Sequence, residues 1–185
     1  MKVLLINGSP HAAGSTYTAL HEMEVVFRKY GMDTERVRIA ALLHDIAKPL
    51  GTEEILRICQ EGGDPVGEEE LASEKVLHAK AGAVLARRDF HITDEEILSA
   101  IRFHTTGRPE MTLLEKIIFI ADYIEPGRSK APNLEKIRRE AQIDLNRCIC
   151  MIARDTLQHL RETGAHVDKR TEETYEYYRS LTNMI

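Results

Sequence analysis

Three histidines and two aspartates of this sequence lie within apolar segments, where an imidazole or a carboxylate is costly to bury. They are His44, Asp45, His78, His104 and Asp122. An ionised carboxylate in such surroundings needs a cation, a hydrogen-bond network or a raised pKa. Imidazole and carboxylate together suit iron, manganese, zinc or nickel ions. Two such ions can activate a water molecule and polarise a phosphoryl oxygen, so the set predicts a metal-dependent hydrolase.

Each of these residues also has a structural explanation when it is taken alone. A single buried histidine is more often a hydrogen-bonded core residue than a metal ligand, and a buried aspartate is more often a helix cap or a salt-bridge partner. The set of five favours a shared metal site, because one assumption then accounts for all of them. By contrast, His91, His159 and His166 lie in polar stretches, for which we expect solvated side chains.

The segments that must position these residues are almost entirely helical. Apolar residues recur at helical spacing from about residue 34 onward, and Thr93 with Glu96 has the capping-box pattern of a helix start. The expected helices cover about residues 34–43, 52–60, 70–88, 93–104, 113–123, 133–163 and 170–183. An apolar strand is expected over 2–6, followed by a helix over about 15–30. The main body is therefore expected to be an all-α helical bundle.

The bulk properties of the chain restrict its partners. Its 185 residues suit one domain, or one domain with a short appendage. A formal net charge of −5 does not favour binding to nucleic acid or to an anionic membrane, so a polyanionic substrate would need local positive charge. Cys59, Cys148 and Cys150 lack zinc-finger spacing, which indicates reduced thiols and a cytoplasmic location. We expect neither a membrane span nor a secretory signal.

Four segments resemble, in order, the motifs of a known family. Residues 40–48 (AALLHDIAK) resemble the signature of the HD phosphohydrolase superfamily. The later motifs of its YqeK-type members are resembled by residues 78–83 (HAKAGA), 100–109 (AIRFHTTGRP) and 114–128 (LEKIIFIADYIEPGR). Ala79 stands where this family usually has glycine. The similarity extends from about residue 16 to near the C-terminus.

The resemblance implies an enzyme that splits diadenosine tetraphosphate into two ADP molecules at a centre of two divalent ions. The ions are expected to be iron, with manganese, zinc or nickel as alternatives. One ion would be held by His44, Asp45 and Asp122. The other would be held by the shared Asp45 together with His78 and His104.

The same resemblance implies roles for residues around these ions. Asp45 and Lys48 would take part in catalysis. The residues expected to bind the phosphates of a nucleoside polyphosphate substrate are Lys48, Thr105, Arg108 and Arg128. A homodimer is also compatible with the family.

One histidine ligand of the family is missing from this sequence. When residues 30–33 are aligned with the family's Tyr-Gly-x-Asp pattern, the position of that histidine falls on Ser15. His11 lies four residues earlier and His21 six residues later. The first ion would then lack a protein ligand unless water or His11 replaces it. The alternative function is therefore a catalytically impaired protein that binds nucleotide or metal without turnover.

The N-terminus has a resemblance of its own. Residues 1–10 (MKVLLINGSP) and 14–18 (GSTYT) resemble the opening of flavodoxin-like NADPH-dependent FMN reductases. There the flavin phosphate would be held by Ser9, Ser15 and Thr16. That fold requires a parallel sheet, whereas this sequence offers one strand. We therefore expect residues 1–16 to be an appended strand and loop on an HD domain over 17–185, with an FMN-dependent reductase as the less favoured function.

Overall fold

The structure is a computed structural model that describes residues 31–182, apart from residues 74–75, 126 and 130. The strand expected over residues 2–6 and the helix expected over 15–30 lie outside this part. Within it, every regular element is a helix, which confirms the all-α class for the described residues. The helices are α2 (Thr34–Leu43), α3 (Thr52–Glu61), α4 (Glu68–Leu71), α5 (Leu77–Asp89), α6 (Glu95–Phe103), α7 (Leu113–Tyr123), α8 (Leu134–Ala141), α9 (Leu145–Thr163) and α10 (Lys169–Thr182).

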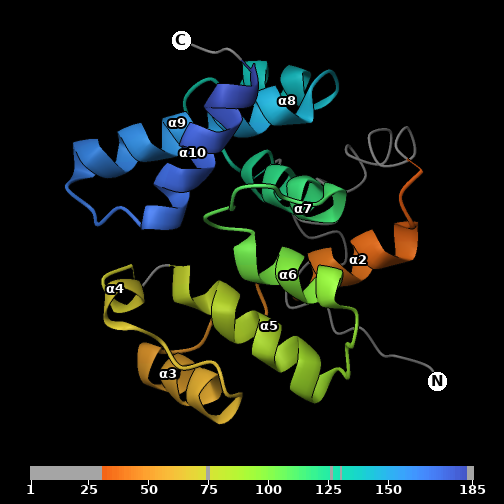
Figure 1. The fold of residues 1–185 in the computed structure, drawn as a ribbon, viewed down its shortest axis with the longest axis vertical. Helices are drawn as coiled ribbons and strands as arrows, with labels where there is room; N and C mark the ends of the chain where they lie inside the picture. The colour runs from red at the N-terminus through yellow and green to blue at the C-terminus, as the bar shows by residue number, and fades with distance from the viewer. Residues whose placement is uncertain (1–30, 74–75, 126, 130, 183–185) are drawn as a thin grey trace.

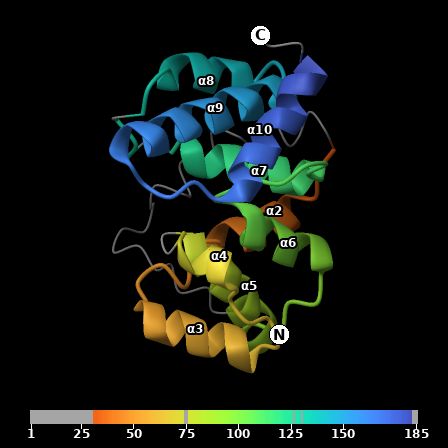
Figure 2. The same cartoon turned by 60° about the vertical axis from the view of Figure 1, so that its left-hand side comes forward.

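The helices lie in three groups, as both ribbon views show (Figures 1 and 2). Helices α8, α9 and α10 lie at one end of the molecule, and α3, α4 and α5 lie at the other. Helices α2, α6 and α7 lie between them, and α6 packs on both α5 and α7. The middle group therefore connects the two ends, and it carries several of the predicted ligands.

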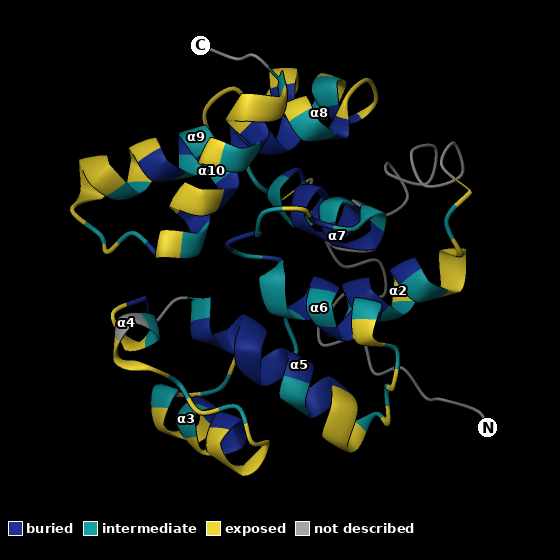
Figure 3. Cartoon of the chain, in the orientation of Figure 1, coloured by how far each residue is buried: buried dark blue, intermediate teal, exposed yellow. Residues whose placement is uncertain are grey.

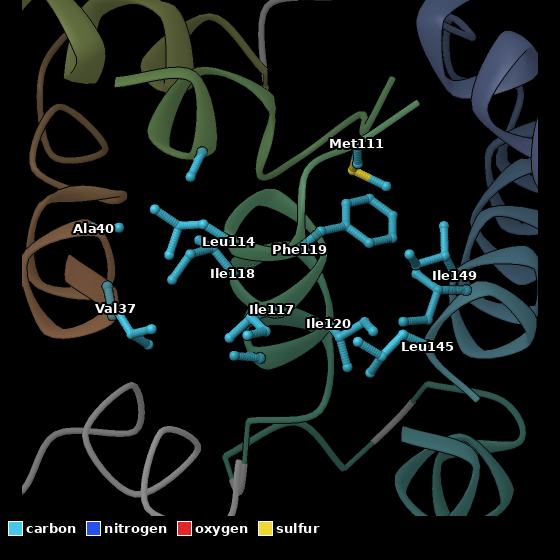
Figure 4. Packing of buried hydrophobic residues seen from close by; sticks show 14 of the residues in the cluster. Val37, Ala40, Met111, Leu114, Ile117, Ile118, Phe119, Ile120, Leu145 and Ile149 are labelled. Atoms are coloured by element: carbon cyan, nitrogen blue, oxygen red, sulfur yellow. The ribbon is translucent and has the colours of Figure 1, made fainter. Parts of the chain in front are cut away.

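Helix α7 forms the centre of the hydrophobic core. Most of its residues are buried (Figure 3). Leu114 and Ile118 lie toward α2, whereas Ile120 lies toward Leu145 and Ile149 of α9 (Figure 4). A helix that is apolar around most of its circumference must be covered on all sides, which is the position that α7 occupies. Its capping box, formed by Thr112 and Glu115, fixes where the helix begins.

Small residues allow α5 to approach the ends of α2 and α6. A Cβ atom added to Gly82 would lie 3.3 Å from the side chain of Ile101 and 3.4 Å from the backbone oxygen of His44. Carbon atoms normally make contact at about 3.5–4.0 Å, so an added Cβ would require a small shift of Ile101 and would fill the space between α5 and the end of α2. Gly82 thus keeps the helix that carries His78 close to the turn that carries His44.

The helix expected over residues 133–163 is in fact two helices, α8 and α9. The sequence between them turns at residues 142–144, and Asp144 accepts hydrogen bonds from the backbone N–H groups of Asn146 and Arg147. An aspartate that satisfies two free N–H groups is a strong signal for a helix start. The amphipathic pattern continues across the turn, and for that reason it predicted a single helix.

Two further helix starts differ from the prediction. The helix expected from residue 70 begins at Leu77 and is preceded by the short helix α4. The N-cap of α6 is Asp94, which accepts from the backbone N–H groups of Glu96 and Ile97, and not Thr93. Aspartate and threonine both cap helices, so adjacent candidates leave the boundary uncertain by one residue when only the sequence is known.

The residues outside the predicted site behave as expected. His91, His159 and His166 are exposed. The three cysteines are free and buried, and burial raises the pKa of Cys148 well above its usual value, which disfavours the thiolate. Among the helices of the described residues, none is both long and apolar enough to cross a membrane.

Candidate metal centre

Four helices bring the predicted ligands to one place. His44 is the C-cap of α2, and His104 is the C-cap of α6. His78 lies in the first turn of α5, and Asp122 lies in the last turn of α7. Asp45 follows α2 directly, so its carboxylate lies where these helix ends meet.

Asp45 is central to the cluster. Its Oδ1 atom lies 3.2 Å from Nε2 of His78 and 3.5 Å from Nε2 of His104. Its Oδ2 atom lies 3.6 Å from Nε2 of His44. That same Nε2 atom of His44 lies 3.7 Å from Oδ1 of Asp122. The structure therefore brings together all five residues, and the two oxygens of Asp45 face two different sets of side chains.

Backbone carbonyls orient two of the imidazoles. Nδ1 of His44 lies 2.7 Å from the carbonyl oxygen of Ala41, and Nδ1 of His104 lies 2.7 Å from that of Ile101. Because a carbonyl only accepts, each Nδ1 carries the proton when the ring is neutral, and each Nε2 keeps a free lone pair. Nε2 of His104 lies 3.3 Å from Nε2 of His78. Acceptor atoms thus gather at the centre of the cluster.

The donor set fits a divalent cation. The ligand atoms of His44, Asp45 and His104 all lie within 4.8 Å of one another. Oδ1 of Asp45 is buried and has no hydrogen-bond partner among the described residues. Leaving such an atom without a partner is costly, and a cation between the Nε2 atoms and this oxygen would satisfy all of them. In metal-ligating histidines, the ring nitrogen that does not bind the metal typically donates a hydrogen bond, often to a backbone carbonyl, as Nδ1 does here.

The protonation states of the two carboxylates and of His104 agree with this donor set. Burial raises the pKa of Asp45, but the neighbouring imidazoles of His104, His78 and His44 outweigh burial and hold that pKa well below its usual value. The pKa of Asp122 is also lowered, because the neighbouring imidazole of His44 outweighs burial. Burial lowers the pKa of His104, which keeps this imidazole neutral. Ionised carboxylates and neutral imidazoles are the forms that bind metals. For His44, burial lowers the pKa, but the carboxylates of Asp122 and Asp45 outweigh burial and raise it, so a cation would have to displace a proton there.

Two of the predicted phosphate-binding cations flank the carboxylates. Nζ of Lys48 donates to Oδ2 of Asp45 at 2.7 Å, and its side chain is exposed. An Nη atom of Arg128 lies 3.7 Å from Oδ2 of Asp122, and the guanidinium lies 4.9 Å from the ring centroid of Tyr123. Nε of Arg128 is buried without a hydrogen-bond partner in the described part of the chain. Arg128 therefore has a donor available for a ligand.

The other two predicted phosphate-binding residues lie beyond His104. Arg108 donates to both carboxylate oxygens of the buried Glu115, at 2.9 and 2.8 Å. This bidentate pair gives Arg108 a structural partner that the sequence did not reveal, because seven residues and a turn separate the two. Thr105 is half-buried and lines a small pocket together with Lys80 and Arg102. The phosphate contacts of both residues remain predictions.

Sequence reasoning missed a network of ion pairs next to the histidines. Lys80, two residues after His78, is buried and pairs with Glu70 and Asp64. Arg102, two residues before His104, pairs with the same Asp64. A lysine within an alanine-rich apolar helix was the one available signal, since such a lysine needs a partner when it is buried.

Comparisons with known proteins identify the family of this chain. The profile of the HD domain matches residues 17–127. A symmetrical bis(5'-nucleosyl)-tetraphosphatase of Halalkalibacterium halodurans is 38% identical over 167 residues, covering 89% of this chain and 85% of the relative. The protein of that name from Bacillus subtilis is 38% identical, covering 90% and 87%. A crystal structure of a predicted HD superfamily hydrolase involved in NAD metabolism from Clostridium acetobutylicum is 40% identical, with a TM-score of 0.85 and 95% and 93% coverage.

The helical fold and the clustered His-Asp pair are those of an HD domain, and the profile match covers more than half of the chain. Within that class, the identity to the curated relatives extends over most of both sequences. The chain belongs to the HD-domain family and, within it, to the family of the symmetrical bis(5'-nucleosyl)-tetraphosphatases.

Proposed function

We propose that this protein is a metal-dependent phosphohydrolase that splits diadenosine tetraphosphate into two ADP molecules. The observation that carries the proposal is the convergence of three histidine Nε2 atoms on the carboxylate of Asp45. The names of the two curated relatives add the reaction class and the substrate class. In the reaction, one water molecule adds across the bond between the second and third phosphates, and each half leaves as ADP.

We propose two divalent ions, with iron as the first metal to test. His44, Asp45 and Asp122 would hold one ion, and Asp45, His78 and His104 would hold the other. The separate directions of the two Asp45 oxygens support a shared, bridging role for this carboxylate. When bound, the ions would activate water and stabilise charge on the phosphoryl oxygens. Imidazole and carboxylate ligands also accept manganese, zinc or nickel, so the metal must be measured.

The cations at the edge of the cluster would bind and orient the phosphates. Within the described part of the chain, the buried Nε–H of Arg128 beside Asp122 has no partner, and a guanidinium suits bidentate contacts to phosphate. Lys48 is exposed and would exchange its pairing with Asp45 for a contact to the incoming phosphate chain. The buried faces of His44 and His104 would exclude bulk water from behind the reacting group.

The second candidate function is binding without turnover. Its basis is the family's further histidine ligand, whose position falls on Ser15, a residue outside the described part of the chain. His11 and His21 also lie outside that part. A site that lacks this ligand would hold the ion at His44 and Asp122 more weakly, and nucleotide could then bind without being hydrolysed.

One experiment separates the two functions. The protein is purified without oxygen and reconstituted with iron, iron per chain is counted, and ADP release from diadenosine tetraphosphate is followed by chromatography. About two ions per chain with ADP as the sole product supports the hydrolase. At most one ion and no ADP, in a folded protein, would overturn the hydrolase and leave the binding protein.

A matched variant strengthens this experiment. Ser15→His restores the ligand type that the family has at the aligned position. If the site is impaired, this variant is expected to gain both iron and turnover. If the parent already holds two ions, the variant should change neither quantity by more than a few-fold. The Asp45→Asn variant serves as the inactive control.

A further inference from the structure

The position of His78 is not secured by an ordinary helix cap. His78 is the second residue of α5, and the N-cap residue Val76 makes no side-chain cap hydrogen bond. The first N–H groups of a helix have no partners within it, and an uncapped first turn frays easily. Contacts from outside the helix can therefore help to hold a metal ligand in this turn.

Lys80 supplies such contacts from the same turn of α5. Its Nζ donates to the Oε2 atom of Glu70 at 2.7 Å and to the carbonyl oxygen of Pro65 at 2.8 Å, and it lies 3.2 Å from Oδ1 of Asp64. Three acceptors match the three N–H groups of an ammonium ion. The side chain is only 8% exposed, so solvent does little to weaken these pairs.

Asp64 also contacts the turn that carries His104, the second histidine predicted to bind the same ion as His78. Besides Lys80, it accepts from two Nη atoms of Arg102, near the end of α6. Arg102 lies two residues before His104, and Lys80 lies two residues after His78. One carboxylate therefore joins the turn that carries His78 to the turn that carries His104.

Glu70 links Lys80 of α5 to α10, the C-terminal helix. It pairs with Lys80 and also accepts from Arg170 of α10 at 2.6 Å. It also accepts from the backbone N–H of Gly67 at 3.1 Å, which fixes the start of α4. Figures 1 and 2 both show α4 beside the beginning of α5. Asp64 in the loop and Glu70 in α4 thus connect three helices, α5, α6 and α10. We call these two carboxylates the brace.

We propose that Asp64 and Glu70 are positioning residues that, through Lys80 and Arg102, hold His78 and His104 at the separation that a shared ion requires. This inference rests on the proposed metal site. In the structure the two Nε2 atoms lie 3.3 Å apart. Outer contacts of this kind typically change metal affinity by about 10- to 100-fold.

The test measures metal binding and local opening separately. Asp64→Asn and Glu70→Gln are titrated with Mn²⁺ alone by calorimetry, and amide hydrogen exchange of residues 77–81 is followed without metal. In both variants, we expect Mn²⁺ to bind at least tenfold more weakly than in the parent at the site that contains His78 and His104. We also expect the amides of residues 77–81 to exchange faster. With the loaded enzyme, kcat should fall while KM for the dinucleotide stays nearly constant.

Glu95→Gln is the matched control. It removes the exposed ion pair between Glu95 and Arg87, which joins the same two helices at their far ends at 2.7 Å. This variant should keep the Mn²⁺ affinity and the exchange rates of the parent. Asp64→Glu retains a carboxylate and should recover part of the affinity that Asp64→Asn loses.

The outcomes are distinct. If the parent binds Mn²⁺ and both brace variants bind it equally well, the positioning role is overturned while the proposed function stands. Equal losses in Glu95→Gln would also overturn it, because the effect would then be general destabilisation. A parent that binds no Mn²⁺ would overturn the proposed metal site itself.

Discussion

The two oxygens of Asp45 carry the chemistry of the cluster, since each faces a different group of ligands. Oδ1 faces His78 and His104, and Oδ2 faces His44 and Lys48. A neutral amide at this position could offer only one good acceptor atom, and it would carry no charge to offset the cations. Loss of the Asp45 carboxylate should therefore impair the proposed site more than any other single change.

Asp45→Asn is expected to lower kcat/KM by at least about 10³-fold, which corresponds to roughly 4 kcal/mol of transition-state stabilisation. Bound iron should fall to one ion per chain or fewer. Steady-state kinetics and metal analysis of the same preparation measure both effects. Asp144→Asn, which keeps an N-cap on α9 far from the cluster, should retain activity. Full activity in Asp45→Asn would contradict the assignment.

Gly107 permits the close contact between the end of α6 and α10. Its φ is +65°, and an added Cβ would lie 2.8 Å from Cγ2 of Thr174. Gly107→Ala should therefore lower the free energy of unfolding by about 2–4 kcal/mol, through backbone strain and steric overlap. Gly164 has the same φ and open space around it, so Gly164→Ala should cost only about 1 kcal/mol. Denaturant unfolding measures the difference, and equal costs would contradict the contact.

The clustering of the five candidate ligands could be predicted from the sequence, whereas the residues that support them could not. His44, His78 and Asp122 stand out because they interrupt apolar helices, where only a shared function explains their cost. Asp64 and Glu70 lie in polar segments that resemble solvated loops, and their partners are distant in the sequence. Their role follows only from the packing of α4 and its loop against α5, α6 and α10, which no local pattern encodes.

At the scale of elements, the prediction succeeded where one physical signal acted alone. The apolar run predicted a helix over residues 113–123, and these are the observed bounds of α7. It failed where two signals competed. The apolar pattern continues from α8 into α9, yet Asp144 can cap a new helix, and the cap determines the observed break at residues 142–144.

The central position of α7 gives a stability prediction. Ile117 is fully buried in the core, so Ile117→Ala should lower the free energy of unfolding by about 2–5 kcal/mol, through lost burial and a new cavity. Ile143 lies in the turn between α8 and α9 and is 68% exposed, so Ile143→Ala should change it by less than about 0.5 kcal/mol. Denaturant titration compares the two. Similar values would mean that α7 is not the core helix.

The ion pairs that hold α4 in place make the free energy of unfolding depend on pH. Burial raises the pKa of Glu70, but hydrogen bonds from Lys80 and Arg170 outweigh it and lower that pKa from 4.5 to about 2. Because the folded-state pKa is depressed, Glu70 stabilises the fold above pH 4.5, and this stabilisation is lost as pH falls toward 2. Its upper size is about 3 kcal/mol.

Glu70→Gln should therefore be less stable than the parent at pH 7, and the difference should shrink as the pH falls from 4.5 toward 2. Denaturant unfolding of the metal-free protein at several pH values measures this difference. Glu176→Gln, which removes an exposed pair with Arg179, is the control and should follow the parent at every pH. A difference that is constant with pH would contradict the assigned ion pairs.

At the scale of the whole molecule, the described helices and the five candidate ligands all follow the N-terminal segment. The HD profile begins at residue 17, and every helix of the described part begins at Thr34 or later. Among the described residues there is no strand with which the apolar run at 2–6 could pair. A lone strand adds little stability without a partner. Residues 1–16 are therefore predicted to be dispensable for the HD fold.

Deleting residues 1–16 should leave a protein that unfolds in one cooperative transition, with a midpoint within a few degrees of the full chain. Iron content and ADP release should also persist, since none of the five predicted ligands is removed, and neither form should take up FMN. Calorimetry, metal analysis and flavin absorbance test the three points. A deletion that loses one ion would instead place His11 or Ser15 at the metal centre. A full chain that turned yellow with FMN would show that its N-terminal resemblance reflects a working flavin site.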